Sequence, residues 1–233
     1  MNVIIPAAGR GQRFADEGYS VPKPFIYVLG KPMLQLALEN LNIDAPHTII
    51  MQRDHVKEYR DVLDSFMKKD WRIVEIDGYT EGPASTCLKA EEFIDNDEPL
   101  LYANCDQYLE WDPKAFIDYV KDYDGGLLVH RDSLPYSSFA VLDESGYVKR
   151  TVEKEVISDV SSTGIYYWSK GSDFVRNAKQ MIERGNRAKN GEYYAINVYN
   201  EGIAEGKKYT VYFIKKFWRI GVPVELKDFV ENI

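Results

Sequence analysis

Two closely spaced glycines followed by three cations stand directly after the first apolar run of the chain. The run covers residues 3–7, and Gly9 and Gly11 come next. Glycines let the backbone approach a ligand closely and turn its N–H groups toward phosphate oxygens. Arginine and lysine side chains add the positive charge that a triphosphate requires. We therefore predict a phosphate site formed by Ala8, Gly9, Arg10, Gly11, Arg13 and Lys23.

This loop follows neither of two common phosphate motifs. The dinucleotide fingerprint requires a third glycine where Phe14 stands, and no Gly-Lys-Ser/Thr run occurs at a helix start. The competing interpretation is a surface loop with solvated basic side chains, which a glycine pair alone would favour. The preceding strand and the three spaced cations favour the phosphate site.

A carboxylate follows a second apolar run, at residues 100–103. In an α/β sheet, ligands bind beyond the carboxyl ends of the strands. Asp106 would therefore lie at the ligand edge, where one carboxylate and substrate phosphates suffice to hold Mg²⁺. The alternative is an aspartate that caps a turn or a helix, and the residue type alone does not decide between them.

Two further segments carry groups suited to a substrate. Glu153 could accept hydrogen bonds from acceptor hydroxyls and Lys154 could hold an acceptor phosphate, although such a pair more often ends a solvated strand. Gly82 precedes a proline-led helix start and would place backbone groups near a nucleotide, unless it is an ordinary helix cap. The three histidines are scattered and show no metal-ligand spacing.

Alternating apolar and amphipathic runs must position these residues. Strands are predicted at 3–7, 47–52, 71–76 and 100–103, and helices at 32–42, 54–69 and 83–94. A helix that begins at Asp112 and Pro113 should follow and be stopped by Gly125 and Gly126. This alternation predicts a mostly parallel sheet with helices on both faces.

The order of predicted strands and helices changes in the second half of the chain. Strands are predicted at 127–130, 138–142, 147–152 and 165–168, followed by a helix at 172–184. We interpret residues 127–233 as an acceptor-side β elaboration on the same sheet, and residues 1–126 as the nucleotide-binding half. The 233 residues would then form a single α/β domain with a mostly parallel mixed sheet flanked by helices.

Composition excludes several classes of partner. The chain has 29 basic and 37 acidic residues, a net charge of -8, and no basic stripe for nucleic acid. No segment approaches the apolar length of a membrane span, and two distant cysteines fit a reducing compartment. We expect a cytoplasmic protein with small phosphorylated ligands and no membrane or nucleic-acid partner, and the sequence leaves homo-oligomer formation open.

Together these segments resemble the sugar nucleotidyltransferase superfamily, whose members share a Rossmann-like, GT-A-like fold. The chain looks closest to its bacterial capsule-type branch, whose members often belong to polysaccharide biosynthesis loci. The matching motifs are Gly9-x-Gly11-x-Arg13, Pro22-Lys23, Gly30-Lys31-Pro32-Met33, Asn104 to Gln107, Glu153-Lys154, Thr163-Gly164-Ile165-Tyr166 and Val198-Tyr199-Asn200.

The resemblance implies a role for each matching residue in the first half of the chain. Gly9, Gly11 and Arg13 would cradle the triphosphate. Lys23 would neutralise charge on the phosphates during transfer, and Asp106 would bind Mg²⁺. Arg13, Lys23 and Asp106 are thus the expected catalytic residues at the nucleotide.

The resemblance also implies contacts to the acceptor and to the base. Glu153 and Lys154 would address the acceptor, with Lys154 sharing in catalysis. The remaining residues expected to contact a substrate are Gln52, Gly82, Pro83, Ala84 and Ser85 near the base, and Asn104, Thr163 and Gly164.

The chain departs from the superfamily near its C-terminus. The usual motif there is Trp-x-x-Gly-Thr-Pro-Glu-Asp, and many relatives carry a metal-binding aspartate just after the tryptophan. Here Arg219 follows Trp218, and a guanidinium cannot bind a cation. A second protein-held metal is therefore in doubt. Arg219 should either approach a substrate phosphate or pair with a surface acid.

The expected reaction transfers a nucleoside monophosphate from an NTP, with CTP or UTP favoured, to a phosphorylated sugar or another small phosphorylated alcohol. Pyrophosphate would be released, and Mg²⁺ would be the cofactor. The alternative is a GT-A glycosyltransferase, but such enzymes usually carry Asp-x-Asp where this chain has Asp106-Gln107-Tyr108. A third alternative, suggested only by Arg219, is a sensor that binds nucleotide but turns it over poorly.

Overall fold

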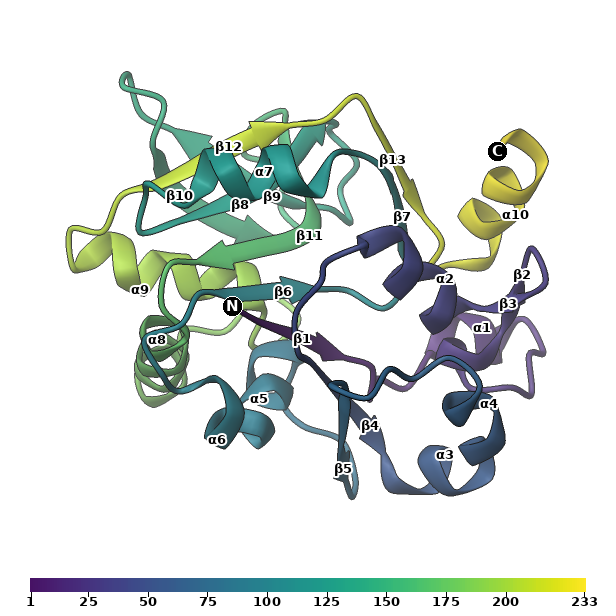
Figure 1. The fold of residues 1–233 in the computed structure, drawn as a ribbon. Helices are drawn as coiled ribbons and strands as arrows, with labels where there is room; N and C mark the ends of the chain where they lie inside the picture. The colour runs from purple at the N-terminus through teal and green to yellow at the C-terminus, as the bar shows by residue number, and fades with distance from the viewer.

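Four parallel strands form the half of the sheet that carries the first site residues. The computed structural model describes residues 1–233. Strand β1 (Asn2–Pro6) lies between β4 (His47–Gln52) and β6 (Leu100–Ala103), and β5 (Arg72–Ile76) pairs with β4 at the edge (Figure 1). All three pairings are parallel, as the alternation of strands and helices predicts.

The second half of the chain extends the same sheet. Strand β11 (Val160–Trp168) runs antiparallel to both β6 and β8 (Gly125–Arg131), and β12 (Tyr209–Phe213) runs parallel to β8. Strands β9 (Ser138–Leu142) and β10 (Val148–Glu153) form a hairpin beside β11. Within the row from β12 to β5 only β11 is reversed, so the predicted mostly parallel mixed sheet is confirmed.

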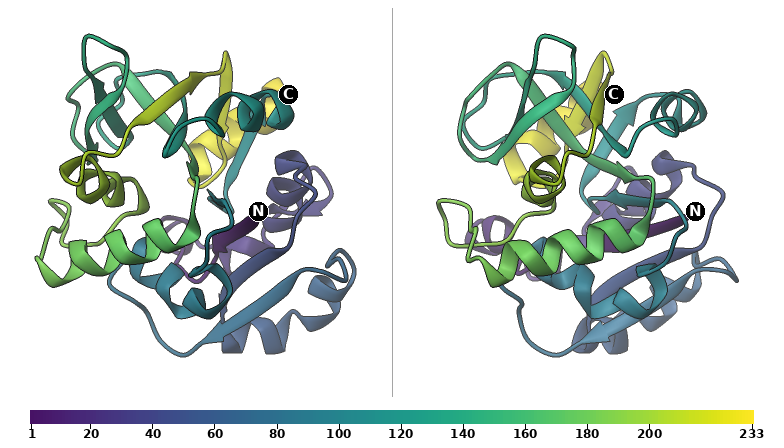
Figure 2. Two further views of the ribbon diagram at one scale, coloured as in Figure 1. Left: turned by 60° about the vertical axis from the view of Figure 1, so that its left-hand side comes forward. Right: turned by 90° about the vertical axis from the view of Figure 1, so that its left-hand side faces the viewer.

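Helices cover both faces of this sheet, because successive side chains of a strand point to opposite sides. Ile4 packs toward α5 (Pro83–Cys87), α6 (Glu91–Ile94), α8 (Gly171–Glu183) and α9 (Val198–Ala204). Val3 and Ile5 pack toward α2 (Met33–Leu41), α3 (Arg53–Glu58), α4 (Arg60–Asp64) and α7 (Pro113–Val120). Figure 2 shows α8, in green, running along one side of the molecule. No helix is both long enough and apolar enough to cross a membrane.

Two predicted helices are broken in the structure. The run at 54–69 becomes α3 and α4, separated at Tyr59, where φ is -109°. The Tyr59 ring stacks on Phe25 with ring centroids 4.1 Å apart, so a tertiary contact outweighs local helix propensity. The run at 83–94 likewise becomes α5, a 3₁₀ turn at Leu88–Ala90, and α6.

The prediction that Gly125 and Gly126 stop a helix is wrong. Helix α7 does begin at Asp112, which accepts a hydrogen bond from the Ala115 N–H at 3.0 Å, but it ends at Val120. The two glycines start β8 instead. A Cβ at Gly125 would collide with the carbonyl oxygen of Tyr167 on the neighbouring strand, so close strand packing explains this glycine.

The C-terminal segment returns to the first half of the chain, which no sequence pattern predicts. Strand β13 (Lys216–Arg219) pairs antiparallel with β7 (Gln107–Glu110), which directly follows Asp106. Helix α10 (Pro223–Asn232) then packs through Phe229 near Phe14 of α1 (Gln12–Asp16) and near the small hairpin of β2 (Tyr27–Val28) and β3 (Lys31–Pro32). Figure 1 shows α10, in yellow, beside these elements.

Candidate active site

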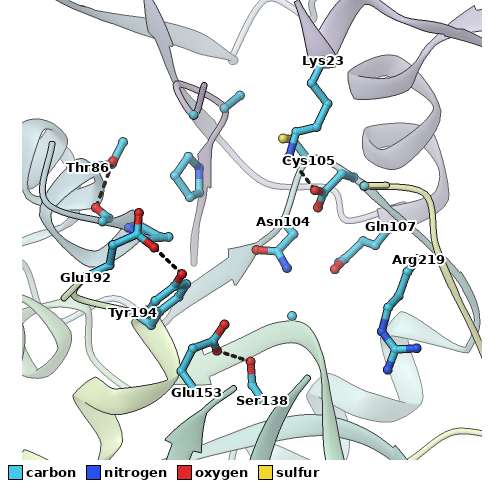
Figure 3. A pocket seen from close by; sticks show the side chains of 18 of the residues that line it. Lys23, Thr86, Asn104, Cys105, Gln107, Ser138, Glu153, Glu192, Tyr194 and Arg219 are labelled. Carbon is cyan, nitrogen blue, oxygen red and sulfur yellow. Dashed lines mark hydrogen bonds and ion pairs between the residues drawn. The ribbon is translucent and has the colours of Figure 1, made fainter. Parts of the chain in front are cut away.

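A cavity of about 530 Å³ opens beyond the carboxyl ends of β1 and β6, within the range of small-molecule sites. It joins the glycine-rich loop to residues of β10, β11 and β13 (Figure 3). The predicted residues that line it are Ala8, Gly9, Arg10, Arg13, Lys23, Gly82, Pro83, Asn104, Asp106, Glu153, Lys154, Thr163, Gly164 and Arg219.

Four predicted residues lie outside the cavity lining. The side-chain amide of Gln52 donates to the carbonyls of Ala8 and Gly78, each at 2.9 Å. Gln52 therefore connects the loop after β1 to the loop after β5. Ala84 is fully buried in α5, Ser85 is the next residue of that helix, and Gly11 lies beneath Lys23 at the start of α1. The structure therefore places these four residues behind the cavity lining, and their contact with a substrate stays a prediction.

The glycine-rich loop after β1 presents cations that have no acidic partner. No aspartate or glutamate oxygen lies within 4.0 Å of the Arg10 or Arg13 guanidinium, although salt bridges are frequent elsewhere in the chain. Arg10 instead lies over the Tyr79 ring, 4.5 Å from its centroid. An anionic ligand in the cavity would meet two arginines that require no exchange of partners.

Lys23 and Asp106 form an ion pair on the cavity wall, with Nζ and Oδ2 2.6 Å apart. Burial disfavours the charged ammonium, but the Asp106 carboxylate outweighs burial and raises the pKa of Lys23 above its usual range. Lys23 therefore stays protonated at neutral pH. The pair therefore places one ammonium and one carboxylate side by side on the cavity wall.

Asp106 is positioned by the C-terminal segment. The Ile220 N–H donates to the Asp106 carbonyl at 3.1 Å. The Asp106 carboxylate lies directly against Gly221, where an added Cβ would collide with Oδ2. The glycine kept from the superfamily motif thus has a packing reason, since a larger residue would displace Asp106.

Arg219 lines the cavity and is tightly held there. It stands opposite Gln107 in the β7–β13 ladder, donates to the Asp132 carboxylate, and donates to Ser137 Oγ at 2.8 Å. Burial works against ionisation of Asp132, but Arg219 outweighs it and lowers the pKa of Asp132. Burial and Arg219 also lower the pKa of His130 to about 4, so His130 is neutral. Arg219 thus pairs with an acid, as one expectation had it, although this acid is partly buried. It also lines the cavity, where the other expectation placed it near a substrate phosphate.

The opposite end of the cavity carries a buried carboxyl. Glu153 is 7% exposed and accepts a hydrogen bond from the Ser138 hydroxyl (Figure 3). Burial raises the pKa of Glu153 to about 7, although Ser138 and Lys154 act in the other direction. The Lys154 ammonium donates to the Tyr194 hydroxyl, which in turn donates to Glu192.

Several lining residues escaped the sequence analysis. Gln107 lines the cavity and adjoins Asp106 in the same motif. Its place in that motif could therefore have identified it as a site residue. Glu192 and Tyr194 come from the irregular segment between α8 and α9, where no motif or periodicity marks them. Tyr136 and Glu225 are brought to the rim by a loop and by α10, and they bond to each other at 3.0 Å.

A sequence profile described as nucleotidyl transferase matches residues 2–223. The chain belongs to this family. The match confirms the predicted superfamily, while the capsule-type branch stays a prediction. Among curated proteins, this nucleotidyl transferase family member is 26% identical to the bifunctional protein GlmU of Methanocaldococcus jannaschii, over 80% of the chain and 44% of that protein. It is also 26% identical to mannose-1-phosphate guanyltransferase beta-A of Xenopus laevis, over 85% of the chain and 59% of that protein.

The chain spans about half the length of these curated relatives. A solved structure of similar size is the nucleoside-diphosphate-sugar pyrophosphorylase from Vibrio cholerae RC9. Its TM-score is 0.87 at 26% identity, with 100% of both chains covered. The nucleotidyl transferase fold therefore accounts for the whole chain.

The cavity of this family member fits Mg²⁺ only as an ion shared with substrate. No group of three histidine, cysteine or acidic side chains is close enough together to form a protein cage. Mg²⁺ needs only one or two carboxylates when substrate phosphates complete its ligands. Asp106 supplies a carboxylate at the cation-rich end of the cavity and is the residue that would hold such an ion.

Replacing Glu153 with glutamine is expected to stabilise the protein at high pH. The carboxyl binds its proton more tightly in the folded state, because its pKa is about 7 there and 4.5 ordinarily. Ionisation therefore destabilises the fold progressively from about pH 4.5 to pH 7. Glu153→Gln should raise the free energy of unfolding at pH 8 by up to roughly 3 kcal/mol and change it little at pH 4.

Urea unfolding of the wild type and of Glu153→Gln at both pH values measures this difference. Glu155→Gln is a matched control, since Glu155 pairs with Lys189 at 3.1 Å and lies outside the cavity lining. An equal change in stability at pH 4 and pH 8 would contradict the raised pKa.

Proposed function

We propose that this chain transfers a nucleoside monophosphate from an NTP to a phosphorylated sugar or another small phosphorylated alcohol, with release of pyrophosphate. The observation that supports the proposal most strongly is a single cavity with two distinct ends. One end carries Arg10, Arg13 and the Lys23–Asp106 pair, and the other carries Glu153 and Lys154. Two anionic substrates can therefore enter one space with their phosphates toward the cations.

The proposed step is attack by an acceptor phosphate oxygen on the α-phosphorus of the NTP, as the bond to the pyrophosphate oxygen breaks. A phosphate monoester has a second pKa of about 6, so it is dianionic at neutral pH and requires no general base. The protein must mainly align two anions and offset their repulsion. Arg13 and Lys23 provide that charge, and a bound Mg²⁺ would add to it.

The choice of base and the pathway are finer proposals. CTP and UTP remain the favoured donors. We propose that the product is used in surface polysaccharide biosynthesis. The name of one relative, mannose-1-phosphate guanyltransferase, makes GTP the competing donor. A glycosyltransferase is less favoured, because Gln107 and Tyr108 follow Asp106 where such enzymes usually carry Asp-x-Asp.

A matrix of four NTPs against phosphorylated sugars and polyols, read by pyrophosphate release with Mg²⁺, tests the proposal. Release that depends on both an NTP and a phosphorylated acceptor is the expected result. Transfer of sugar from a sugar nucleotide, without pyrophosphate, would support the glycosyltransferase instead. Nucleotide binding without any turnover would support a sensor.

Replacing Arg219 with alanine is expected to lower kcat/KM by about tenfold or more, the scale of one lost charge-assisted contact. Arg219 faces the cavity while Asp132 and Ser137 hold its guanidinium in place. The comparison variant is Asp132→Asn, which keeps the cation but weakens its anchor, and should cost less. Wild-type rates in a folded Arg219→Ala protein would limit Arg219 to a structural ion pair.

A further inference from the structure

We propose that the phosphorylated acceptor also carries an ammonium group, and that Glu153 and Glu192 receive this group. The inference rests on the proposed function and narrows its acceptor to a zwitterionic phosphorylated amine. Both carboxylates line the end of the cavity away from Lys23, and Figure 3 shows them on either side of Tyr194.

Neither carboxylate has a cationic partner in the protein. Asp106 pairs with Lys23, and Asp132 and Glu225 each have a guanidinium nitrogen of Arg219 within 4.0 Å. No lysine, arginine or histidine nitrogen comes this close to Glu153 or Glu192, although the two carboxylates sense each other's charge. Of the four acidic residues that line the cavity, Glu153 and Glu192 are therefore the two without an ion pair.

Lys154 forms no ion pair with either carboxylate, although its charge acts to lower the pKa of Glu153. Its ammonium donates to the Tyr194 hydroxyl and lies 4.6 Å from the centroid of that ring. The Lys154 backbone has a φ of 56°, and its N–H donates to the Ser137 carbonyl at 2.9 Å. Even with Lys154 counted, this end holds two carboxylates for one cation.

Glu153 keeps one carboxylate oxygen free to accept a hydrogen bond from a ligand. One oxygen of Glu153 is bonded to Ser138, and the other accepts no hydrogen bond from the protein. On the side of the cavity nearer Arg219, the side-chain oxygen of Gln107 is also buried without any partner. An ammonium supplies three N–H donors together with the missing charge, whereas a hydroxyl supplies one donor and no charge. No third histidine, cysteine or acidic side chain lies close enough to complete a metal site made of protein side chains alone.

The Glu192 carboxylate is held in place, because it accepts hydrogen bonds from the Asn190 amide at 2.6 Å and from the Tyr194 hydroxyl. Its segment is clamped to the loop before α5, since the Tyr193 N–H donates to the Glu81 carbonyl at 2.8 Å. The Ala84 N–H donates back to the Tyr193 carbonyl at 3.0 Å. Burial opposes ionisation of Glu153. A bound cation would favour the ionised carboxylate and so offset the effect of burial.

Two matched pairs of acceptors test the inference. The pairs are glucosamine 1-phosphate with glucose 1-phosphate, and ethanolamine phosphate with ethylene glycol phosphate; the members of each differ by an ammonium in place of a hydroxyl. Pyrophosphate release is measured with the NTP that gives the highest rate. We expect kcat/KM for the amine to exceed that for its partner by about tenfold or more in at least one pair. A smaller ratio in both pairs overturns the inference.

Substitution of Glu192 tests whether this carboxylate causes the preference for amine acceptors. Glu192→Gln should reduce the ratio of amine to hydroxyl kcat/KM about tenfold, while Glu155→Gln, outside the cavity lining, should leave it unchanged. An unchanged ratio in folded Glu192→Gln would remove Glu192 from the inference. If hydroxyl acceptors react as well as amines, only the inference fails, whereas absence of pyrophosphate release with every phosphorylated acceptor defeats the proposed function itself.

Discussion

Asp106→Asn is expected to abolish turnover, with a loss of about a thousandfold or more, while the protein remains folded. The carboxylate lies at the end of β6, is set by Gly221 and the Ile220 N–H, and faces the cation-rich end of the cavity. An asparagine keeps the shape but loses the charge that would hold Mg²⁺ on the substrate phosphates. Loss of a catalytic metal removes several kcal/mol of transition-state stabilisation, which is the scale of the expected effect.

The fold should tolerate this change because the Lys23–Asp106 pair is partly exposed, with side-chain exposures of 19% and 22%. Thermal unfolding and NTP binding verify that the variant is intact, and Mg²⁺-dependent pyrophosphate release measures its activity. Asp118→Asn on α7 is the control, since that aspartate pairs with Lys114 on the surface and should leave the rate unchanged. Near-normal Mg²⁺-dependent turnover in folded Asp106→Asn would refute the metal assignment.

The parts of the fold that the sequence predicted are those whose signal is local. Strands β4 and β6 match the predicted 47–52 and 100–103 because each contains an apolar run, at 49–51 and 100–103, and is buried on both faces. Strands β7 and β13 were missed because each is short, and their pairing joins segments more than 100 residues apart. The break at Tyr59 and the role of Gly125 depend on tertiary neighbours, which no local pattern contains.

The same distinction applies to the site. Arg13, Lys23, Asp106 and Glu153 belong to short motifs, and the structure places all of them around one cavity. Residues such as Glu192 reach the cavity only because a distant backbone contact holds their segment. Conversely, Gln52 carries a polar side chain at a strand end, as a ligand-binding residue would. Its amide is instead used by the carbonyls of Ala8 and Gly78, which only the fold can reveal.

Lys23→Ala is expected to lower kcat about a hundredfold or more while weakening NTP binding much less. Negative charge grows on the oxygen that leaves with pyrophosphate, so a cation at that point stabilises the transition state more than the bound substrate. Lys23 is well suited to this role, because Asp106 keeps it protonated and fixes its ammonium 2.6 Å from the carboxylate. Arg10 and Arg13 remain in the variant to bind the triphosphate.

Removing Lys23 also frees the Asp106 carboxylate, so the Mg²⁺ concentration for half-maximal rate should not rise. This separates loss of Lys23 from loss of the metal site, since Asp106→Asn should weaken Mg²⁺ use directly. Steady-state rates across NTP and Mg²⁺ concentrations measure both quantities. Lys31→Ala serves as the control, because Lys31 pairs with Glu39 on the surface. An increase confined to the NTP KM, with kcat intact, would make Lys23 a binding residue whose charge acts equally on the ground state and the transition state.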